Sequence, residues 1–143
     1  MTYPFNEAEL PRLGKDVIRT RVLKYGEVTG SQAYGTAHVD SDFDIAVPIG
    51  WMSKVMEIIG DRETVDSDYG AGFYFRDGDG VVVNIIPLHF HAYEAWVLAT
   101  KMMTVALKDM PYLSSTSKYA MFEGFVALFK IATPYPHGEE YKP

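Results

Sequence analysis

The chain has 143 residues, 48% of them hydrophobic and 22% charged, which fits one globular domain with a hydrophobic core. The net charge is −6 with only 13 Lys and Arg residues, so the many phosphate contacts that a long nucleic acid needs are not expected. There is no cysteine for a disulfide or thiolate metal site, no membrane-length apolar run and no signal-peptide pattern, so we expect a cytoplasmic protein.

The first two thirds of the chain predict a mixed α/β domain. Apolar residues at three- and four-residue spacing indicate a helix over 6–25, with Asn6 and Pro11 as alternative starts and Gly26 as its stop. The elements predicted next are, in order, a strand over 27–30, a helical turn over 32–34, a strand over 43–49, a helix over 52–59, a loop or edge strand over 61–69, and strands over 72–76 and 81–88.

Two of these segments indicate how the sheet is built. The near-continuous apolar run over 43–49 is typical of a central strand, with Pro48 near its end. The DGDG residues 77–80 between the last two strands favour a β-hairpin. We therefore expect an α/β (α+β) domain with a short mixed sheet packed with helices, and a core over residues 12–90.

The C-terminal third predicts a helical pair over 91–132 and then an irregular tail over 133–143. An amphipathic helix is expected over 91–110, with Pro111 after it, and a second helix over 114–131 is apolar on two rows. A helix that is apolar nearly all round is either buried or used as an interface. Residues 114–132 are therefore expected to contact a second copy of the chain or a helical protein partner. With no internal repeat, the whole chain 1–143 is expected to be one domain.

The most informative stretch is 29–48, which reads TGSQAYGTAHVDSDFDIAVP. A tight turn at Gly30 and Ser31 brings backbone N–H groups and a hydroxyl within reach of an anion. Asp42 and Asp44, two residues apart on a strand, point to the same face, and like charges that close resist joint ionisation unless a cation lies between them. An anion cradle opposite a carboxylate pair suits a metal-bound nucleoside triphosphate. A solvated turn and strand is the plainer alternative.

The order Gly30-Ser31, ten residues, and then Asp42-Phe43-Asp44-Ile45 resembles the signature of the DNA polymerase β-like nucleotidyltransferase superfamily. The wider string GSQAYGTAHVDSDFDI is similar to small stand-alone nucleotidyltransferases of bacteria and phages. The resemblance implies the nucleotidyltransferase fold, with Gly30 and Ser31 binding the β- and γ-phosphates of an NTP, which we take to be ATP. Asp42 and Asp44 would bind Mg²⁺ or Mn²⁺.

The reaction implied by this resemblance transfers a nucleoside monophosphate, AMP in our expectation, to a hydroxyl by metal-assisted in-line displacement. Pyrophosphate is the leaving group. The acidic net charge of −6 favours a small molecule or a protein side chain as acceptor over the end of a nucleic acid.

Asn84 departs from the pattern of this family. Members that transfer nucleotides usually have a third Asp or Glu on a neighbouring apolar strand, and VVNII at 82–86 places Asn84 in that position. Asn offers a carbonyl oxygen to a metal but cannot act as a base, and losing general-base assistance costs roughly 10²–10⁴-fold in rate. The alternative is therefore a catalytically impaired, nucleotidyltransferase-like protein that binds nucleotide, or binds a partner as an antitoxin binds its toxin.

Other titratable residues are weaker candidates. Asp79 lies in the predicted turn and is a poor replacement for a third carboxylate. Glu94 and Glu123 are expected on helices, and the sequence does not say whether either reaches the site. His89 and His91 share a strand-face spacing, which we interpret as surface or packing residues rather than a metal site.

Overall fold

The computed structural model describes residues 17–67, 72–110 and 112–132. Its helices and strands follow one another in the order α1 (Arg19–Val22), β1 (Glu27–Thr29), α2 (Gly30–Tyr34), β2 (Phe43–Pro48), the 3₁₀ turn η2 (Ile49–Trp51), α3 (Met52–Ile59), β3 (Thr64–Asp66), β4 (Phe73–Arg76), β5 (Val82–Leu88), α4 (Phe90–Asp109) and α5 (Ser115–Ala132). None of the helices within these ranges is long and apolar enough to cross a membrane.

The strands form one five-stranded mixed sheet in the order β1-β2-β5-β4-β3. Strands β2 and β5 are parallel, and the other neighbours are antiparallel. The predicted mixed sheet, the inner position of β2 and the β4–β5 hairpin are confirmed. The predicted edge strand is β3, which pairs with β4 alone.

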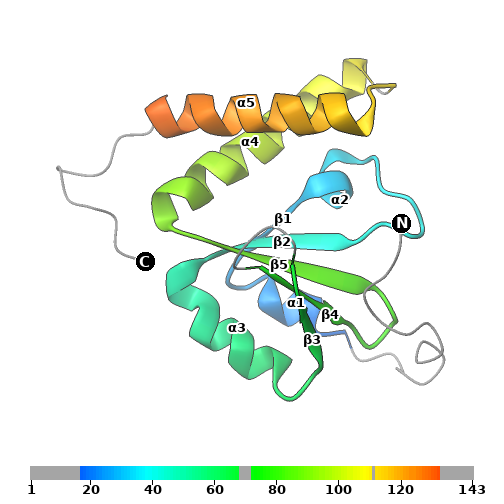
Figure 1. Cartoon of the computed structure of the whole chain (residues 1–143), viewed down its shortest axis with the longest axis vertical. Coiled ribbons are helices and arrows are strands. Elements are labelled where there is room, and N and C mark those ends of the chain that lie inside the picture. The colour runs from blue at the N-terminus through cyan, green and yellow to red at the C-terminus, as the bar shows by residue number, and fades with distance from the viewer. Residues whose placement is uncertain (1–16, 68–71, 111, 133–143) are drawn as a thin grey trace.

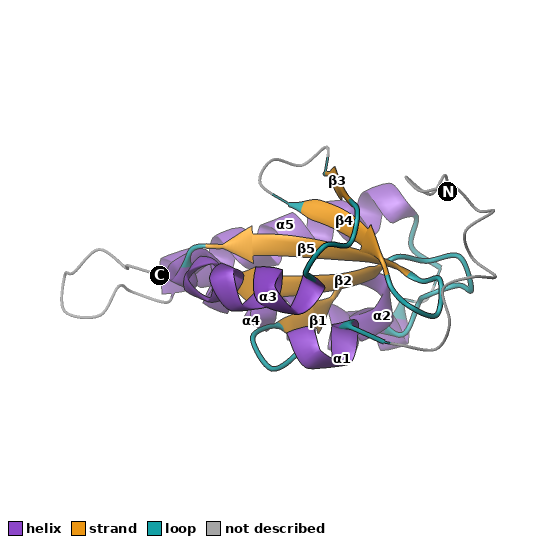
Figure 2. Cartoon of the chain, turned by 90° about the horizontal axis from the view of Figure 1, so that it is seen from below, coloured by secondary structure: helices purple, strands orange, loops and turns teal. Residues whose placement is uncertain are grey.

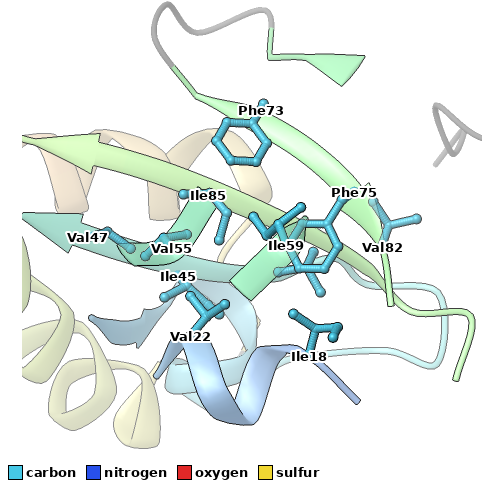
Figure 3. Close-up of a cluster of buried hydrophobic side chains, with 11 residues drawn as sticks. Ile18, Val22, Ile45, Val47, Val55, Ile59, Phe73, Phe75, Val82 and Ile85 are labelled. Carbon is cyan, nitrogen blue, oxygen red and sulfur yellow. The ribbon is translucent and has the colours of Figure 1, made fainter. Parts of the chain in front are cut away.

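Helices cover both faces of the sheet (Figures 1 and 2). Helices α1 and α3 lie on one face, and α2, α4 and α5 lie on the other. Figure 3 shows Val22 of α1 and Val55 of α3 beside Ile45 and Ile85 of the two parallel strands. All four side chains are fully buried, and burying a side chain of this size stabilises the fold by about 1.5–3 kcal/mol. This cluster is the core of the domain.

A second cluster joins α4 to α5, as the prediction of a C-terminal helical pair requires. Its buried members are Ala99, Met103 and Leu107 of α4 and Phe122 of α5. Beyond this contact, α5 exposes large apolar side chains: Tyr119 (55%), Leu128 (56%) and Ile131 (83%). The predicted contact of 114–132 with a second copy or a helical partner stays a prediction.

Within the described residues, the predicted helix over 6–25 is wrong at both ends. Val17 and Ile18 precede α1, which begins at Arg19, and the prediction also runs too far at the C-terminal end. Helix α1 ends at Val22, and turn hydrogen bonds follow at Lys24 and Tyr25. The physical reason lies at Gly26, where a Cβ would overlap the carbonyl oxygen of Ala46. The chain must therefore leave the helix early to run closely beside β2. Residues 1–16 and the predicted tail 133–143 lie outside the described residues.

A buried carboxylate fixes the start of α1. Asp77 is fully buried and accepts hydrogen bonds from the backbone N–H groups of Ile18 (2.5 Å) and Arg19 (3.0 Å). The Arg19 guanidinium lies 2.8 Å from Asp77 and 2.6 Å from Asp79, and its hydrogen bond lowers the pKa of Asp79. Asp79 is thus held in a structural ion pair, in line with its being a poor catalytic acid.

We expect Asp77→Ala to lower the free energy of unfolding by about 3–5 kcal/mol, because it leaves the backbone N–H groups of Ile18 and Arg19 without their acceptor and removes the buried partner of the Arg19 guanidinium. Asp79→Ala should cost about 0–1 kcal/mol, since that carboxylate lies at the surface. Urea denaturation of both variants measures the difference. Equal losses would contradict the role assigned to Asp77.

Candidate active site

Polar side chains form a row across four neighbouring strands of the sheet. Thr29 of β1 pairs with Asp44 of β2, Asp44 pairs with Asn84 of β5, and Asn84 pairs with Tyr74 of β4. Residues paired in this way lie side by side on one face of a sheet. The row therefore brings a hydroxyl, a carboxylate, an amide and a phenol from distant parts of the sequence together.

This row lines a cavity of about 950 Å³, whose other walls come from α2, α4 and α5. The cavity is lined by all five residues that the sequence singled out: Gly30, Ser31, Asp42, Asp44 and Asn84. From α5, three charged side chains line it, namely Lys118, Glu123 and Lys130. The structure thus gathers the predicted phosphate-binding and metal-binding residues at one place and adds charged residues of the C-terminal helix.

Gly30 and Asp44 approach each other too closely for any other residue at position 30. Gly30 has a φ of 69°, in the left-handed region that favours glycine. A Cβ at this position would overlap Oδ2 of Asp44. The glycine is therefore needed both for the turn between β1 and α2 and for seating the Asp44 carboxylate beside it.

Burial is the main influence on the protonation of both aspartates. Burial, and then the charge of Asp42, raise the pKa of Asp44 to about 6, while a hydrogen bond from the Asn84 side chain acts in the opposite direction. Burial also raises the pKa of Asp42. A cation between these groups would relieve the cost of ionising both.

The residues present fit a divalent metal ion. Oδ1 of Asp42 and Oδ1 of Asn84 are both buried without a hydrogen-bond partner in the structure. Such orphaned oxygens are costly, and together with the Asp44 carboxylate they offer the oxygen ligands that Mg²⁺ and Mn²⁺ prefer. Within the described residues there is no group of three or more His, Cys, Asp or Glu suited to a metal. The third ligand available here is an amide oxygen.

Helix α4 holds the turn that carries Gly30 and Ser31. Nε1 of Trp96 donates a hydrogen bond to Oγ1 of Thr29 (2.9 Å), and the Thr29 and Thr100 hydroxyls are hydrogen-bonded to each other (2.7 Å). One turn further on, the Thr104 hydroxyl donates to the carbonyl oxygen of Ala33 in α2 (3.2 Å). From the sequence, Trp96 was predicted only as an apolar position on a helix, and no local signal indicates these contacts.

Of the weaker candidates from the sequence, some line the cavity and others lie elsewhere. Glu123 lines the cavity, whereas Glu94 and the two histidines, His89 and His91, are not among its lining residues. Nε2 of His91 lies 2.9 Å from the carbonyl oxygen of Lys130, which joins the two C-terminal helices. Tyr74 was not selected from the sequence. Counting back from Asn84 across the predicted hairpin would have placed Tyr74 opposite Asn84.

Comparisons with protein-family models, with curated proteins and with solved structures find no match to this chain. Membership of the nucleotidyltransferase superfamily therefore stays a prediction from residues 30–45.

The raised pKa of Asp44, about 6, predicts a pH dependence of stability in metal-free solution. The folded protein binds this proton more tightly than the unfolded chain does, so stability falls as the pH rises from about 4 through about 6. Asp44→Asn should therefore increase the free energy of unfolding at pH 7 by about 1–3 kcal/mol and have little effect at pH 4. Urea denaturation in EDTA at both pH values tests this. A gain of the same size at pH 4 would contradict it.

Gly30→Ala and Gly35→Ala form a matched pair, because both glycines are left-handed, with φ of 69° and 79°. Gly35→Ala should cost only backbone strain, about 1–2 kcal/mol, since a Cβ there would meet nothing within 4 Å. Gly30→Ala should cost about 1–3 kcal/mol more, because it displaces Asp44. Urea denaturation of both variants measures the difference. Equal behaviour of the two variants would show that the Gly30–Asp44 contact is unimportant.

Proposed function

We propose that this protein is a nucleotidyltransferase that moves a nucleoside monophosphate, AMP in the first instance, from an NTP to a hydroxyl acceptor. The observation that carries the proposal is the convergence of Gly30, Ser31, Asp42, Asp44 and Asn84 on one cavity. The likeness of residues 30–45 to the polymerase β-like signature supports it, and so does the five-stranded mixed sheet that holds Asp44 beside Asn84. We extend the proposal to the nucleotidyltransferase fold and to a cytoplasmic location, where NTPs are found.

The roles of the residues follow from their chemistry. Gly30, having no side chain, lets a phosphate come close to the backbone, and the Ser31 hydroxyl donates a hydrogen bond to a phosphate oxygen. Asp42, Asp44 and the amide oxygen of Asn84 would hold Mg²⁺ or Mn²⁺. Such an ion, when bound, neutralises phosphate charge and favours in-line attack at the α-phosphorus.

The positive charges that line the cavity come from Lys118 and Lys130 of α5. A triphosphate entering beside two aspartates in a chain of net charge −6 needs such cations as well as a metal. The cavity volume of about 950 Å³ is large for a small-molecule site. It leaves room for a nucleotide and part of an acceptor, which we propose is a small molecule or a protein side chain.

One observation favours a second candidate function. Asn84 lies directly opposite Asp44, and its amide cannot take a proton from an attacking hydroxyl. The second candidate is therefore a protein that binds nucleotide at this site with little or no turnover. Such a protein would act on a partner, as an antitoxin does, through the exposed apolar residues of α5.

Label transfer from α-labelled ATP, with Mg²⁺ or Mn²⁺ and with or without cell extract, distinguishes the two functions. We expect transfer by the parent protein and none by the Asp42→Ala/Asp44→Ala double variant, which has lost the metal ligands. Calorimetric titration with ATP and Mn²⁺ reports binding separately. Binding without transfer would support the second function, and transfer gained only in Asn84→Asp would show that the base alone is missing. Absence of both binding and transfer would refute both functions.

A further inference from the structure

The cavity contains one carboxylate that the proposed metal site does not use. Among the described residues that line it, carboxylates come from Asp42, Asp44 and Glu123, and no histidine is present. Asp42 and Asp44 are the metal ligands of the proposed function, and Asp44 pairs with Asn84 in the sheet. Glu123 belongs to α5, is exposed to solvent, and has no ion pair or hydrogen bond within the described part of the chain. Its side chain is therefore available to a ligand in the cavity.

Glu123 is placed by the residue before it. The Phe122 ring is buried, meets the Trp96 ring edge-on with centroids 4.8 Å apart, and lies 6.3 Å from the Tyr34 ring. Trp96 in turn donates to Thr29, the strand neighbour of Asp44. Through these contacts, α5 is attached to the same framework that carries the aspartates and the Gly30 turn.

The neighbours of Glu123 on the helix confirm which way this surface faces. Tyr119 and Ala127, four residues before and after Glu123, line the cavity too. Residues four apart lie on one side of a helix. Glu123 is thus in the middle of a helical stripe directed at the cavity.

We propose that Glu123 of α5 is the general base of the nucleotidyl transfer. It would accept the proton that the amide of Asn84 on β5 cannot accept. The inference rests on the proposed function. The acceptor oxygen forms a bond to the α-phosphorus of the NTP as the bond from that phosphorus to the β-phosphate oxygen breaks. Pyrophosphate leaves with the electron pair, and the proton of the acceptor hydroxyl passes to the Glu123 carboxylate.

This assignment divides the site into two functional walls. On the side of the sheet, Asp42, Asp44 and Asn84 would hold the metal ion that neutralises phosphate charge, and the helix contributes the group that removes the proton. Asn84 then serves as a neutral ligand, so the site carries one negative charge fewer next to the triphosphate. The third acid is supplied from a helix that is distant from the signature in sequence.

Glu123→Gln tests the proposal, because it removes the base and keeps the size of the side chain. Transfer is followed from α-labelled ATP with Mn²⁺, using the low-molecular-weight and protein fractions of a cell extract as sources of hydroxyl acceptors. We expect kcat to fall about 10²–10⁴-fold, while the Kd for ATP with Mn²⁺ stays within about twofold. Glu57→Gln is the control, since Glu57 is exposed on α3 at the opposite face of the sheet, and it should match the parent.

A second variant distinguishes a role of Glu123 as a base from a role of Glu123 in folding. Asn84→Asp introduced into Glu123→Gln should restore a part of kcat, because a carboxylate is again next to Asp44. Transfer by Glu123→Gln at the parent rate would overturn the proposal and leave the proposed function intact. Parallel loss of nucleotide binding and kcat would also overturn it, since Glu123 would then bind substrate. If the parent protein neither binds ATP nor transfers label, the proposed function itself fails, and the inference with it.

Discussion

The parallel pairing of β2 with β5 is the constraint on which the rest of the structure depends. It places Asp44 beside Asn84 and, in the next position, Ile45 beside Ile85. Because side chains alternate between the two faces of a sheet, the same register points the polar pair into the cavity and the isoleucines into the core. A shift of the β2–β5 register by one residue would move the polar pair to the core face and the isoleucines to the cavity face. The burial of the core therefore fixes the geometry of the candidate site.

Close contacts around Asp44 show how that geometry is kept. On one side Gly30 leaves just enough room for the carboxylate, and on the other the Asn84 side chain donates a hydrogen bond to it. Behind the turn, Thr29 is held by Trp96 and Thr100 of α4. A partly buried carboxylate such as Asp44, next to the charge of Asp42, is unfavourable in the folded protein by itself. In the proposed function, a bound divalent ion would offset this cost.

Helix α5 gives the cavity its second wall and its positive charge. It is attached to the remainder of the domain chiefly through α4 and the ring of Phe122, whereas Lys118, Glu123 and Lys130 line the cavity. In the proposed function, the sheet would hold the metal and this separately packed helix would contact the acceptor. The helix would then determine which acceptors are used.

Local pattern determined most of the elements and the position of the candidate site. Turn residues and hydrophobic periodicity predicted β2, α3, the β4–β5 hairpin and the helical pair to within a residue or two, and the Gly30-Ser31 and Asp42-Asp44 spacing predicted where charge gathers. These signals are local, so the sequence carries them directly. Tertiary structure alone decided four features: the early end of α1, the capping of its start by Asp77, the row from Thr29 to Tyr74, and the position of Glu123 at the cavity. Each depends on contacts between residues far apart in the chain. Only the packing of the sheet and helices brings such residues together.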